Sequence, residues 1–424
     1  MKAAGALALA AVLLAGCARA GTRAHDSQTL TIVQQREPLS LNPAMDNGTS
    51  STQWGLLLFS YLVKFDDRDR LVGDVAAQVP SLANGGISKD GRTITYHLRA
   101  GVRFSDGVPL TARDCVWSIR AIQNPANDVQ SRYGYDRVVA ADAPDDRTLV
   151  LHLKAPFAPL TTIVLAPQGF PILPAHVLSK YPNFNDVAFN GAPVGSGPYV
   201  VRSWNRGDRV ELRANPYYFR GKPKIDRMVV RFVADSTTAI DQLRTGEADG
   251  FFNDQDLGNY PILRAVPGVR TTGRPMNAVG ALIFNTRDPL TADTRVRHAL
   301  AQGFDIATTV AKAYRGALDA KQAGRGLFIW AYDPAAYPDV AYDPARAARL
   351  LDAAGWVRGS DGVRRKGGRS LDLLLIVQAA TPGDAVVANV IAKAEEAIGA
   401  RVEIKAFSAN QFVAPASLGG PVYG

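Results

Sequence analysis

The stretch Gly195–Tyr218, GSGPYVVRSWNRGDRVELRANPYY, has the most regular local pattern in the chain and lies near its middle. Side chains alternate in character through Tyr199–Trp204 and again through Arg209–Ala214, which is the period of a β-strand. The residues between the two runs are Asn205–Asp208, in which Gly207 can adopt the positive φ that a tight turn needs. The stretch therefore predicts a β-hairpin.

The glycines ahead of this hairpin, Gly195 and Gly197, also allow a second interpretation as a phosphate-binding loop. Such a loop needs a Gly-Lys-Ser/Thr sequence that leads into a helix, whereas these glycines lead into a strand. We therefore predict that the hairpin is a scaffold. Substitution of Trp204 or Tyr199 is expected to cost stability before it costs ligand selectivity.

Length and composition bound the architecture. The chain has 424 residues, 47% of them hydrophobic and 21% charged, which is enough for two or three lobes with their own cores. A net charge of +9 would be compatible with nucleic-acid binding, but arginine and aspartate alternate along the chain without forming a basic stripe. We therefore predict no nucleic-acid partner. The main basic cluster, Arg364–Lys366 with Arg369, is predicted to be a solvated hairpin tip.

The N-terminus predicts export. Lys2 precedes an apolar stretch, Ala3–Ala15, which is shorter than the roughly 20 residues that span a bilayer. The following Leu14–Cys17 resembles a lipobox, which makes Cys17 the lipidated first residue of the mature chain. The alternative is a plain signal peptide with an incidental cysteine. The only other cysteine, Cys115, is predicted to be a lone buried thiol.

Beyond the hairpin, the pattern alternates between strands and capped helices, which predicts an α/β fold. Strands are expected at 30–34, 93–99, 148–153, 228–233, 251–252, 279–285, 371–377 (buried on both faces) and 402–406. Helices are expected at 51–62, from Thr111, at 175–180, at 236–245, from Asp293, from Asp343 to Gly355, and at 385–399.

No residue set predicts catalysis or metal binding. The histidines lie far apart and have no metal-type spacing, and no nucleophile stands beside a base. Adjacent acids on turns and helix surfaces are expected to be solvated. The histidines are His25, His97, His152, His176 and His298, and the acid pairs are Asp66–Asp67, Asp145–Asp146 and Glu395–Glu396. We predict no enzyme activity, no metal and no cofactor, although an exported hydrolase or peptidase is kept as a separate class to test.

Eight motifs, in order along the chain, resemble one family: the extracytoplasmic solute-binding proteins (family 5) of peptide and nickel ABC transporters, of the oligopeptide- and dipeptide-binding type. The resemblance covers residues 30–424. The motifs are Ser40–Pro43, the run YHLRAGVRFSDGVPLTARDCVWS from Tyr96, Gly195–Tyr199, Ala214–Tyr218, Lys222–Asp226, Thr245–Asp249, Val296–Leu300, and Tyr342–Pro344 with Leu351 and Ala354–Trp356.

The resemblance implies a three-lobed periplasmic-binding-protein fold of the type II, clam-shell kind, and we expect its C-terminal part to be missing from this sequence. Lobes I and III would close on the ligand. The implied boundaries are 1–17 for the signal peptide, 18–26 for a tether, 27–52 with 168–273 for lobe I, 53–167 for lobe II, and 274–424 for an incomplete lobe III. The chain is then expected to be either a fragment or a truncated product, and the strand 402–406, whose expected neighbours do not follow it in the sequence, favours the fragment.

The resemblance also implies where the ligand binds. The loop Asn47, Gly48 and Thr49 corresponds to the position at which members of the family contact the main chain of a bound peptide. Wall positions are implied for Phe252, Asn253, Asp254 and Asn285, with Tyr133 and Tyr135 reaching in from lobe II. For each residue the alternative is a loop or strand end that is satisfied locally, and the acidic residue that grips the peptide amine in relatives lies beyond this sequence.

The expected function is capture of short peptides by a monomeric lipoprotein, held outside the cytoplasmic membrane by Cys17, which delivers them to an ABC permease and its ATPase. Main-chain hydrogen bonds and water-filled side-chain pockets would let one site accept many peptides. Nickel chelates, haem, opines and oligosaccharides stay open as ligands, as does a peptide-binding sensor without transport. Peptide length and the membrane that carries the anchor also stay open.

Overall fold

The computed structural model describes residues 28–46, 51–68, 70–252, 259–272, 281–314, 335, 340–378 and 382–407. Packing divides the chain into two units, unit 1 (residues 1–252) and unit 2 (residues 253–424). This division falls inside the range 168–273 expected for lobe I, and the lobe boundaries stay a prediction. Within the described ranges, no helix combines the length and the apolar composition needed to cross a bilayer.

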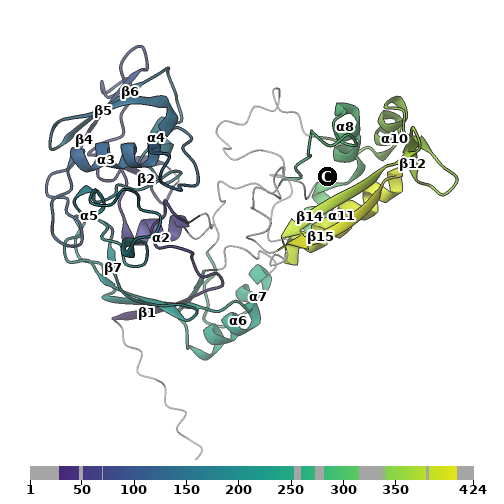
Figure 1. Cartoon of the computed structure of the whole chain (residues 1–424). Helices are drawn as coiled ribbons and strands as arrows, with labels where there is room; N and C mark the ends of the chain where they lie inside the picture. The colour runs from purple at the N-terminus through teal and green to yellow at the C-terminus, as the bar shows by residue number, and fades with distance from the viewer. Residues whose placement is uncertain are drawn as a thin grey trace, which may run out of the picture. The chain divides into compact units, whose positions relative to one another are not determined.

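Unit 1 is built on a five-stranded mixed sheet with the order β10-β1-β9-β8-β7 (Figure 1). Strand β1 runs parallel to both of its neighbours, and β8 is antiparallel to β9 and β7. The predicted hairpin is confirmed, with Gly207 at φ 75° and one irregularity between Val201 and Ser203. The strands are β1 Thr29–Gln34, β7 Tyr199–Asn205, β8 Arg209–Ala214, β9 Arg227–Phe232 and β10 Gly250–Phe252.

The strand period places alternate side chains on opposite faces of this sheet. The inner face contributes Ile32, Val210 and Val230 to the main core of the unit. On the other face, helix α6 (Ser236–Thr245) covers Val33. Asp235 caps α6 and Gly246 ends it at φ 72°, so the helix predicted at 236–245 is confirmed.

A second group of elements in unit 1 shares the same core, and Figure 1 shows α3 beside β4, β5 and β6. The order of this sheet is β4-β6-β5, and the capping box predicted at Thr111 begins α3, with Thr111 N donating to Asp114 Oδ2 (2.9 Å). Cys115 in α3 is buried, as predicted. The elements are β2 Val63–Phe65, β3 Leu71–Gly73, β4 Thr93–His97, α3 Ala112–Gln123, β5 Val138–Asp145, β6 Thr148–Leu153, α4 Leu160–Ile163 and α5 Ala175–Leu178, with single 3₁₀ turns at Tyr135–Arg137 and Ala188–Asn190.

Helix α2 (Ser51–Leu58) is shorter than the helix predicted at 51–62. Tyr61 and Leu62 lie beyond its end, although both are fully buried. The helical spacing of these apolar residues therefore reflects burial of the whole segment and not a longer helix.

Unit 2 contains a pair of parallel strands, β14 (Asp372–Gln378) and β15 (Arg401–Phe407), and Figure 1 shows α11 (Pro382–Ile398) lying along them. The strand expected at 402–406 is therefore not without a neighbour, because β15 pairs with β14 along its whole length. The strand at 371–377 is not buried on both faces, because Asp372 and Leu374 are exposed. The described part of the strand expected at 279–285, residues 281–285, is not a strand. The remaining elements are α7 Tyr260–Arg264, α8 Thr294–Gly303, α9 Ile306–Tyr314, α10 Pro344–Ala353, β11 Val357–Arg358, β12 Arg364–Lys366 and β13 Arg369–Ser370.

The basic cluster at Arg364–Lys366 is not wholly a solvated tip, because Arg364 is only 3% exposed. Its Nε donates to Ile398 O (2.8 Å) and its guanidinium also donates to Trp356 O (2.6 Å). The Ile398 carbonyl belongs to the last turn of α11, where a helix leaves acceptors unpaired, and the Trp356 carbonyl lies just past the end of α10. Arg364 therefore joins the β11-β12-β13 hairpin to the ends of two helices.

Glu395 on α11 also differs from the expectation of a solvated acid pair. Its side chain is 2% exposed, and neither carboxyl oxygen has a hydrogen-bond partner among the described residues. A side chain at Gly303 of α8 would approach these oxygens to 3.3 and 3.5 Å, so the glycine leaves room for the carboxyl group. Glu396, the next residue, is exposed.

Glu395 makes the stability of unit 2 depend on pH. Burial raises the pKa of Glu395 from 4.5 to about 9, because desolvation penalises the charged form. Between these values the folded chain keeps a proton that the unfolded chain has lost, so the free energy of unfolding falls as the pH rises, by about 1.4 kcal/mol per pH unit. Glu395→Gln should therefore retain about 3 kcal/mol that the wild type loses from pH 5 to pH 7.

Urea unfolding at a series of pH values measures this difference, with Glu396→Gln as the matched control. The control should keep the slope of the wild type. Equal slopes for the wild type and Glu395→Gln would show that the buried carboxyl does not hold its proton.

Candidate functional site

The carboxyl ends of parallel strands β1, β9 and β10 meet at one edge of the unit 1 sheet. Gln34, the last residue of β1, stands in register with Phe252 of β10 and with Phe232 of β9. In open α/β sheets, ligands bind at the carboxyl ends of the strands, where loops leave the sheet. This edge is therefore the candidate binding edge of unit 1.

Two glutamines follow one another at this edge. Gln34 is buried, and its Nε2 donates to Arg36 O (2.8 Å). Gln35 Nε2 donates to Ser236 Oγ (2.8 Å) at the first turn of α6. Gln35 Oε1 is buried and has no hydrogen-bond partner within the described ranges. A buried acceptor without a donor costs about 1–3 kcal/mol, so Gln35 Oε1 is an unsatisfied polar group at this edge of the sheet.

The turn of the central hairpin is fastened next to this edge. Trp204 Nε1 donates to Glu37 Oε1 (2.8 Å), and Gly207 N donates to both Glu37 oxygens (3.1 and 3.2 Å). The guanidinium of Arg206 stacks 3.4 Å from the centre of the Trp204 ring. These contacts tie the segment that leaves β1 to the hairpin, which supports the scaffold role predicted for Trp204.

The segment before residues 47–50 is held by asparagine contacts within unit 1. Leu41 N donates to Asn190 O (2.8 Å), and Asn42 Nδ2 donates to Asn190 Oδ1 (3.0 Å). Asn42 and Ser40 are buried. The Ser40–Pro43 motif therefore fixes the approach to the predicted binding loop and is engaged inside the protein.

The segment after residues 47–50 is held by glycines of the stretch Gly195–Tyr218. Gly197 N donates to Leu58 O at the end of α2 (3.0 Å), and Ser60 Oγ donates to Ser196 O (2.9 Å). A side chain at Gly195 would meet Leu58 O at 1.9 Å, and one at Gly197 would meet the Leu58 carbonyl carbon at 2.5 Å. Glycine is required at both positions because two backbone segments cross here and leave no room for a Cβ atom. This crossing fixes the position of α2.

Several predicted site residues lie outside the described residues: Asn47, Gly48, Thr49, Asn253, Asp254 and the lipidation site Cys17. Phe252 is described and lies at the candidate edge, half-buried against the main core. Asn253 and Asp254 follow it directly in the sequence. The binding roles of these residues stay predictions.

Tyr133 and Tyr135 have different environments. Tyr135 is 1% exposed, and its hydroxyl accepts from Leu165 N (3.0 Å) and Phe170 N (3.4 Å), while burial raises the pKa of this phenol well above its ordinary value. Tyr135 is therefore a core residue, and its side chain presents no surface to a ligand. Tyr133 is 58% exposed, with its ring edge-on to Phe157 at 5.7 Å, and remains available for contact.

Asn285 lies in unit 2, at the start of a turn. Its Oδ1 accepts from Arg287 N (3.1 Å) and its carbonyl accepts from Thr291 Oγ1 (2.6 Å). The side chain is exposed. Asn285 thus has the local hydrogen bonds of a turn residue, and its role in ligand binding stays a prediction.

The sequence reasoning missed Gln34 and Gln35. The available signal was weak: two polar residues at the end of an apolar strand, followed by Arg36 and Glu37. The same pattern is typical of any strand that ends at the surface. Only the register with β9 and β10 shows that this strand end lies among other carboxyl ends.

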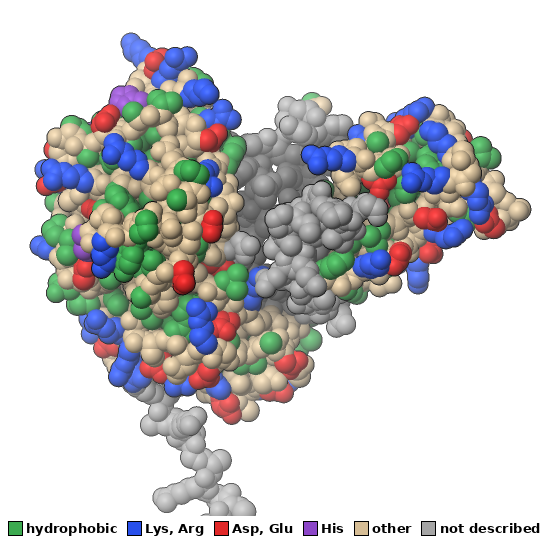
Figure 2. Space-filling view, viewed as in Figure 1, with side chains coloured by type: hydrophobic (Ala, Val, Ile, Leu, Met, Phe, Trp, Pro, Cys, Tyr) green, Lys and Arg blue, Asp and Glu red, His purple; other side chains and the backbone are tan. Residues whose placement is uncertain are grey.

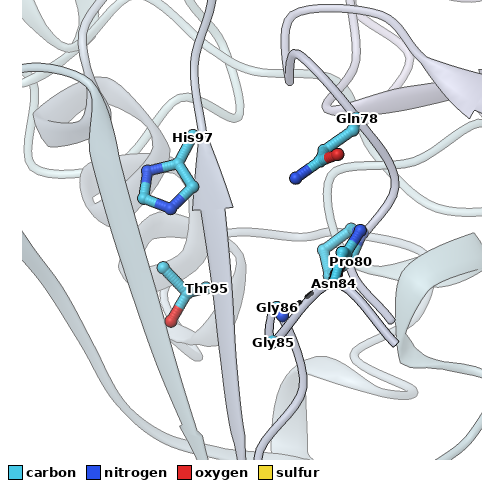
Figure 3. Close-up of a pocket in the computed structure, with 7 residues that line it drawn as sticks. All are labelled: Gln78, Pro80, Asn84, Gly85, Gly86, Thr95 and His97. Atoms are coloured by element: carbon cyan, nitrogen blue, oxygen red, sulfur yellow. Dashed lines mark hydrogen bonds between the residues drawn. The ribbon is translucent and has the colours of Figure 1, made fainter. Parts of the chain in front are cut away.

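A separate cavity of about 160 Å³ opens between β4 and the loop before it. Figure 3 shows Thr95 and His97 on the strand facing Gln78 and Pro80 across the opening. Asn84 shapes the loop, since its Oδ1 accepts from Gly86 N (3.0 Å). None of the residues predicted to bind the ligand lines this cavity. In the described portion, no three His, Cys, Asp or Glu side chains gather as a metal site.

Comparison with known proteins places this arrangement in a family. The family model of the bacterial extracellular solute-binding proteins, family 5, matches residues 77–420. Protein XP55 of Streptomyces lividans is 33% identical over 91% of this chain, and the oligopeptide-binding protein AppA of Bacillus subtilis is 25% identical over 80%. The chain spans 67% and 62% of the lengths of these two relatives.

A solved structure gives the same result at the level of the fold. NikZ of Campylobacter jejuni, in complex with Ni(L-His), superposes with a TM-score of 0.77 over 91% of this chain and 75% of its own, at 25% identity. Because the family model covers more than half of the sequence and the mixed α/β fold agrees with it, this chain belongs to the bacterial extracellular solute-binding proteins of family 5, which bind solutes and are not enzymes.

Proposed function

We propose that this chain is the substrate-binding component of an ABC importer and that its substrates are short peptides. The family match carries the proposal, together with a relative, AppA, named as an oligopeptide-binding protein. Hydrogen bonds to the peptide main chain would suit this role, because every peptide offers N–H and C=O groups regardless of its sequence. The chain would deliver the peptide to the membrane permease and its ATPase.

The proposed site combines the candidate edge with the segments next to it. Asn47, Gly48 and Thr49 would contact the peptide main chain from a loop whose flanks are fixed by Asn190 and by Gly197. Phe252, Asn253 and Asp254 would form the wall where β10 ends. Asn285 and Tyr133 would add contacts from lobes III and II, in the three-lobed clam-shell arrangement expected from the sequence.

Calorimetry and thermal shift with di- to nonapeptides test the peptide assignment. A ligand that binds only the folded chain raises its melting temperature, by an amount that grows with ligand concentration. Asn253→Ala combined with Asp254→Asn should weaken binding about tenfold or more, the effect of roughly 1.4 kcal/mol, and leave the melting temperature of the free chain unchanged. Asn205→Ala, at the exposed hairpin turn, is the matched control.

A non-peptide solute is the second candidate, because NikZ, whose structure contains Ni(L-His), superposes well on this chain. The same calorimetry with nickel and histidine together, with an opine and with haem separates the two. If one of these raises the melting temperature and no peptide does, the peptide assignment is wrong while the binding-protein assignment stands.

We also propose that the mature chain is anchored to the membrane by a lipid on Cys17, as its resemblance to a lipobox suggests. Labelled fatty acid should be incorporated by the wild type and not by Cys17→Ala. Incorporation by both, or by neither, would contradict the anchor and favour a plain signal peptide.

A further inference from the structure

The outer face of the five-stranded sheet is rich in arginine. Alternate residues of β8 and β9 point into the core and their neighbours point outward. The inward residues are Val210, Leu212, Met228 and Val230. The outward residues, which we call the arginine face, are Arg209, Glu211 and Arg213 of β8 and Arg227, Val229 and Arg231 of β9.

The arginines oppose each other in pairs. Arg209 is in register with Arg231, and Arg213 with Arg227. Like charges directly opposite on neighbouring strands destabilise a sheet. Arg209 is compensated by Asp208 and Glu211 (2.6 and 3.0 Å), but the other three guanidinium groups have no ion pair or hydrogen bond with any described residue. The face thus carries repulsion that an external anion would relieve.

The described structure covers this face only in part: Arg209, Glu211, Val229 and Arg231 are partly buried. Helix α6 packs over Val33 of β1, but no described helix packs closely against β8 or β9. Figure 2 views the sheet from its side and shows Lys and Arg side chains, with some acidic neighbours, on the lower part of unit 1 where Figure 1 draws β1. Arg213 and Arg227 are both exposed.

The N-terminal end of the sheet brings this face close to the proposed anchor. Gln28 O accepts from Arg227 N (2.9 Å) and from Asp226 N (3.1 Å), so the chain enters β1 beside the Arg213–Arg227 pair. Only residues 18–27 separate Gln28 from Cys17. Even fully extended, a segment of this length reaches about 35 Å. A lipid on Cys17 would keep the arginine face near the bilayer.

We propose that the arginine face docks onto the anionic phospholipid headgroups of the membrane that carries the anchor. This inference rests on the proposed function in one respect, because it is the lipid anchor on Cys17 that would bring the arginine face to the bilayer. Guanidinium groups bind phosphate oxygens in bidentate fashion. A single lipid anchor gives weak and reversible membrane binding, and a basic patch is the usual second signal. Each basic residue near an anionic surface contributes about 1 kcal/mol, or roughly fivefold in partitioning.

Vesicle sedimentation tests the proposal with the chain from residue 18 onward, which keeps every described residue. The wild type should bind vesicles of mixed phosphatidylglycerol and phosphatidylcholine, bind phosphatidylcholine alone far more weakly, and dissociate at high salt. Arg213→Gln combined with Arg227→Gln should lower the partition coefficient about 25-fold. The matched control is Lys89→Gln with Arg92→Gln, an equal charge change at an exposed turn of the same unit.

A single charge reversal separates docking from folding. Arg213→Glu places an acid opposite Arg227, so its melting temperature should be no lower than that of the wild type while its binding to phosphatidylglycerol vesicles falls. Equal binding to both vesicle types by the wild type, or an equal loss of binding in the Lys89/Arg92 control, would overturn the proposal. An acidic protein surface would then be the alternative partner of the arginine face.

The vesicle assay is independent of the proposed function. The chain used carries no lipid, so a failure of Cys17 lipidation appears in the fatty-acid labelling and not here. Peptide binding should be unchanged in the Arg213 and Arg227 variants, because neither residue lies at the candidate edge. Loss of peptide binding in these variants would contradict the assignment of the face to lipid alone.

Discussion

Replacing Gly195 by alanine is expected to destroy the native packing of unit 1. The added Cβ would lie 1.9 Å from Leu58 O and 2.9 Å from the Leu58 carbonyl carbon, distances that real Cβ atoms do not reach. Both neighbours are backbone atoms at the end of α2, so no side-chain rotation relieves the overlap. We expect a loss of about 4 kcal/mol or more in the free energy of unfolding, at the upper end of single substitutions.

Gly191→Ala is the matched control, because a Cβ there meets only Ala188 O at 3.7 Å, an ordinary contact. Urea unfolding followed by tryptophan fluorescence should separate the two variants clearly. If Gly195→Ala unfolded at the same urea concentration as Gly191→Ala, the backbone crossing would be wrong. Since α2 begins directly after residues 47–50, any folded Gly195→Ala chain should also bind ligand more weakly than the wild type.

Replacing Arg364 by methionine is expected to unfold much of unit 2. Methionine keeps most of the apolar stem but leaves the carbonyls of Trp356 and Ile398 without their donor, and it also removes the contact with Asp352. A buried acceptor left without a partner costs about 1–3 kcal/mol, and two such acceptors together with imperfect packing give a loss of roughly 3–5 kcal/mol.

The neighbouring Arg365 provides the control for this prediction. Its exposed guanidinium pairs with Asp361 (2.6 Å), and Arg365→Met should change the unfolding transition little, because exposed ion pairs contribute little to stability. Circular dichroism during urea unfolding reports both variants. Equal behaviour of Arg364→Met and Arg365→Met would show that the carbonyl contacts of Arg364 do not hold the hairpin to the helices.

The sequence predicted local elements well wherever the signal was local. The turn of the central hairpin contains Gly207 at a positive φ, and α6 runs from its Asp235 cap to Gly246, as the pattern indicates. Strand 279–285 failed over its described part because an apolar run without a visible partner does not fix a strand. The helix predicted at 51–62 extends beyond the observed one, because a segment that is buried on all sides can have apolar residues at helical spacing without being a helix.

The candidate site was predicted only in part. The resemblance pointed to Phe252, which lies at the carboxyl edge, but it also included Tyr135, whose hydroxyl is engaged in the core. Exposure of a tyrosine depends on which loops fold over it, and no feature next to Tyr135 in the sequence reveals Leu165 and Phe170 as its partners. Gln35 was missed for the same reason, since Ser236 is distant in sequence.

By itself, the sequence determined the central hairpin, the capped helices and, through its motifs, the family, because turns, caps and strand periods depend on residues that are close in the chain. The tertiary structure alone decided why Gly195 and Gly197 are glycines, which charged residues are buried, and which arginines share a face. Arg364 and Glu395 look solvated in sequence, and Arg213 and Arg227 look like parts of two mixed-charge runs. Burial and cross-strand register are set by segments far apart in the chain. The close approach of the Gly195–Tyr218 stretch to the backbone at the end of α2 therefore exists only once the two segments are folded together.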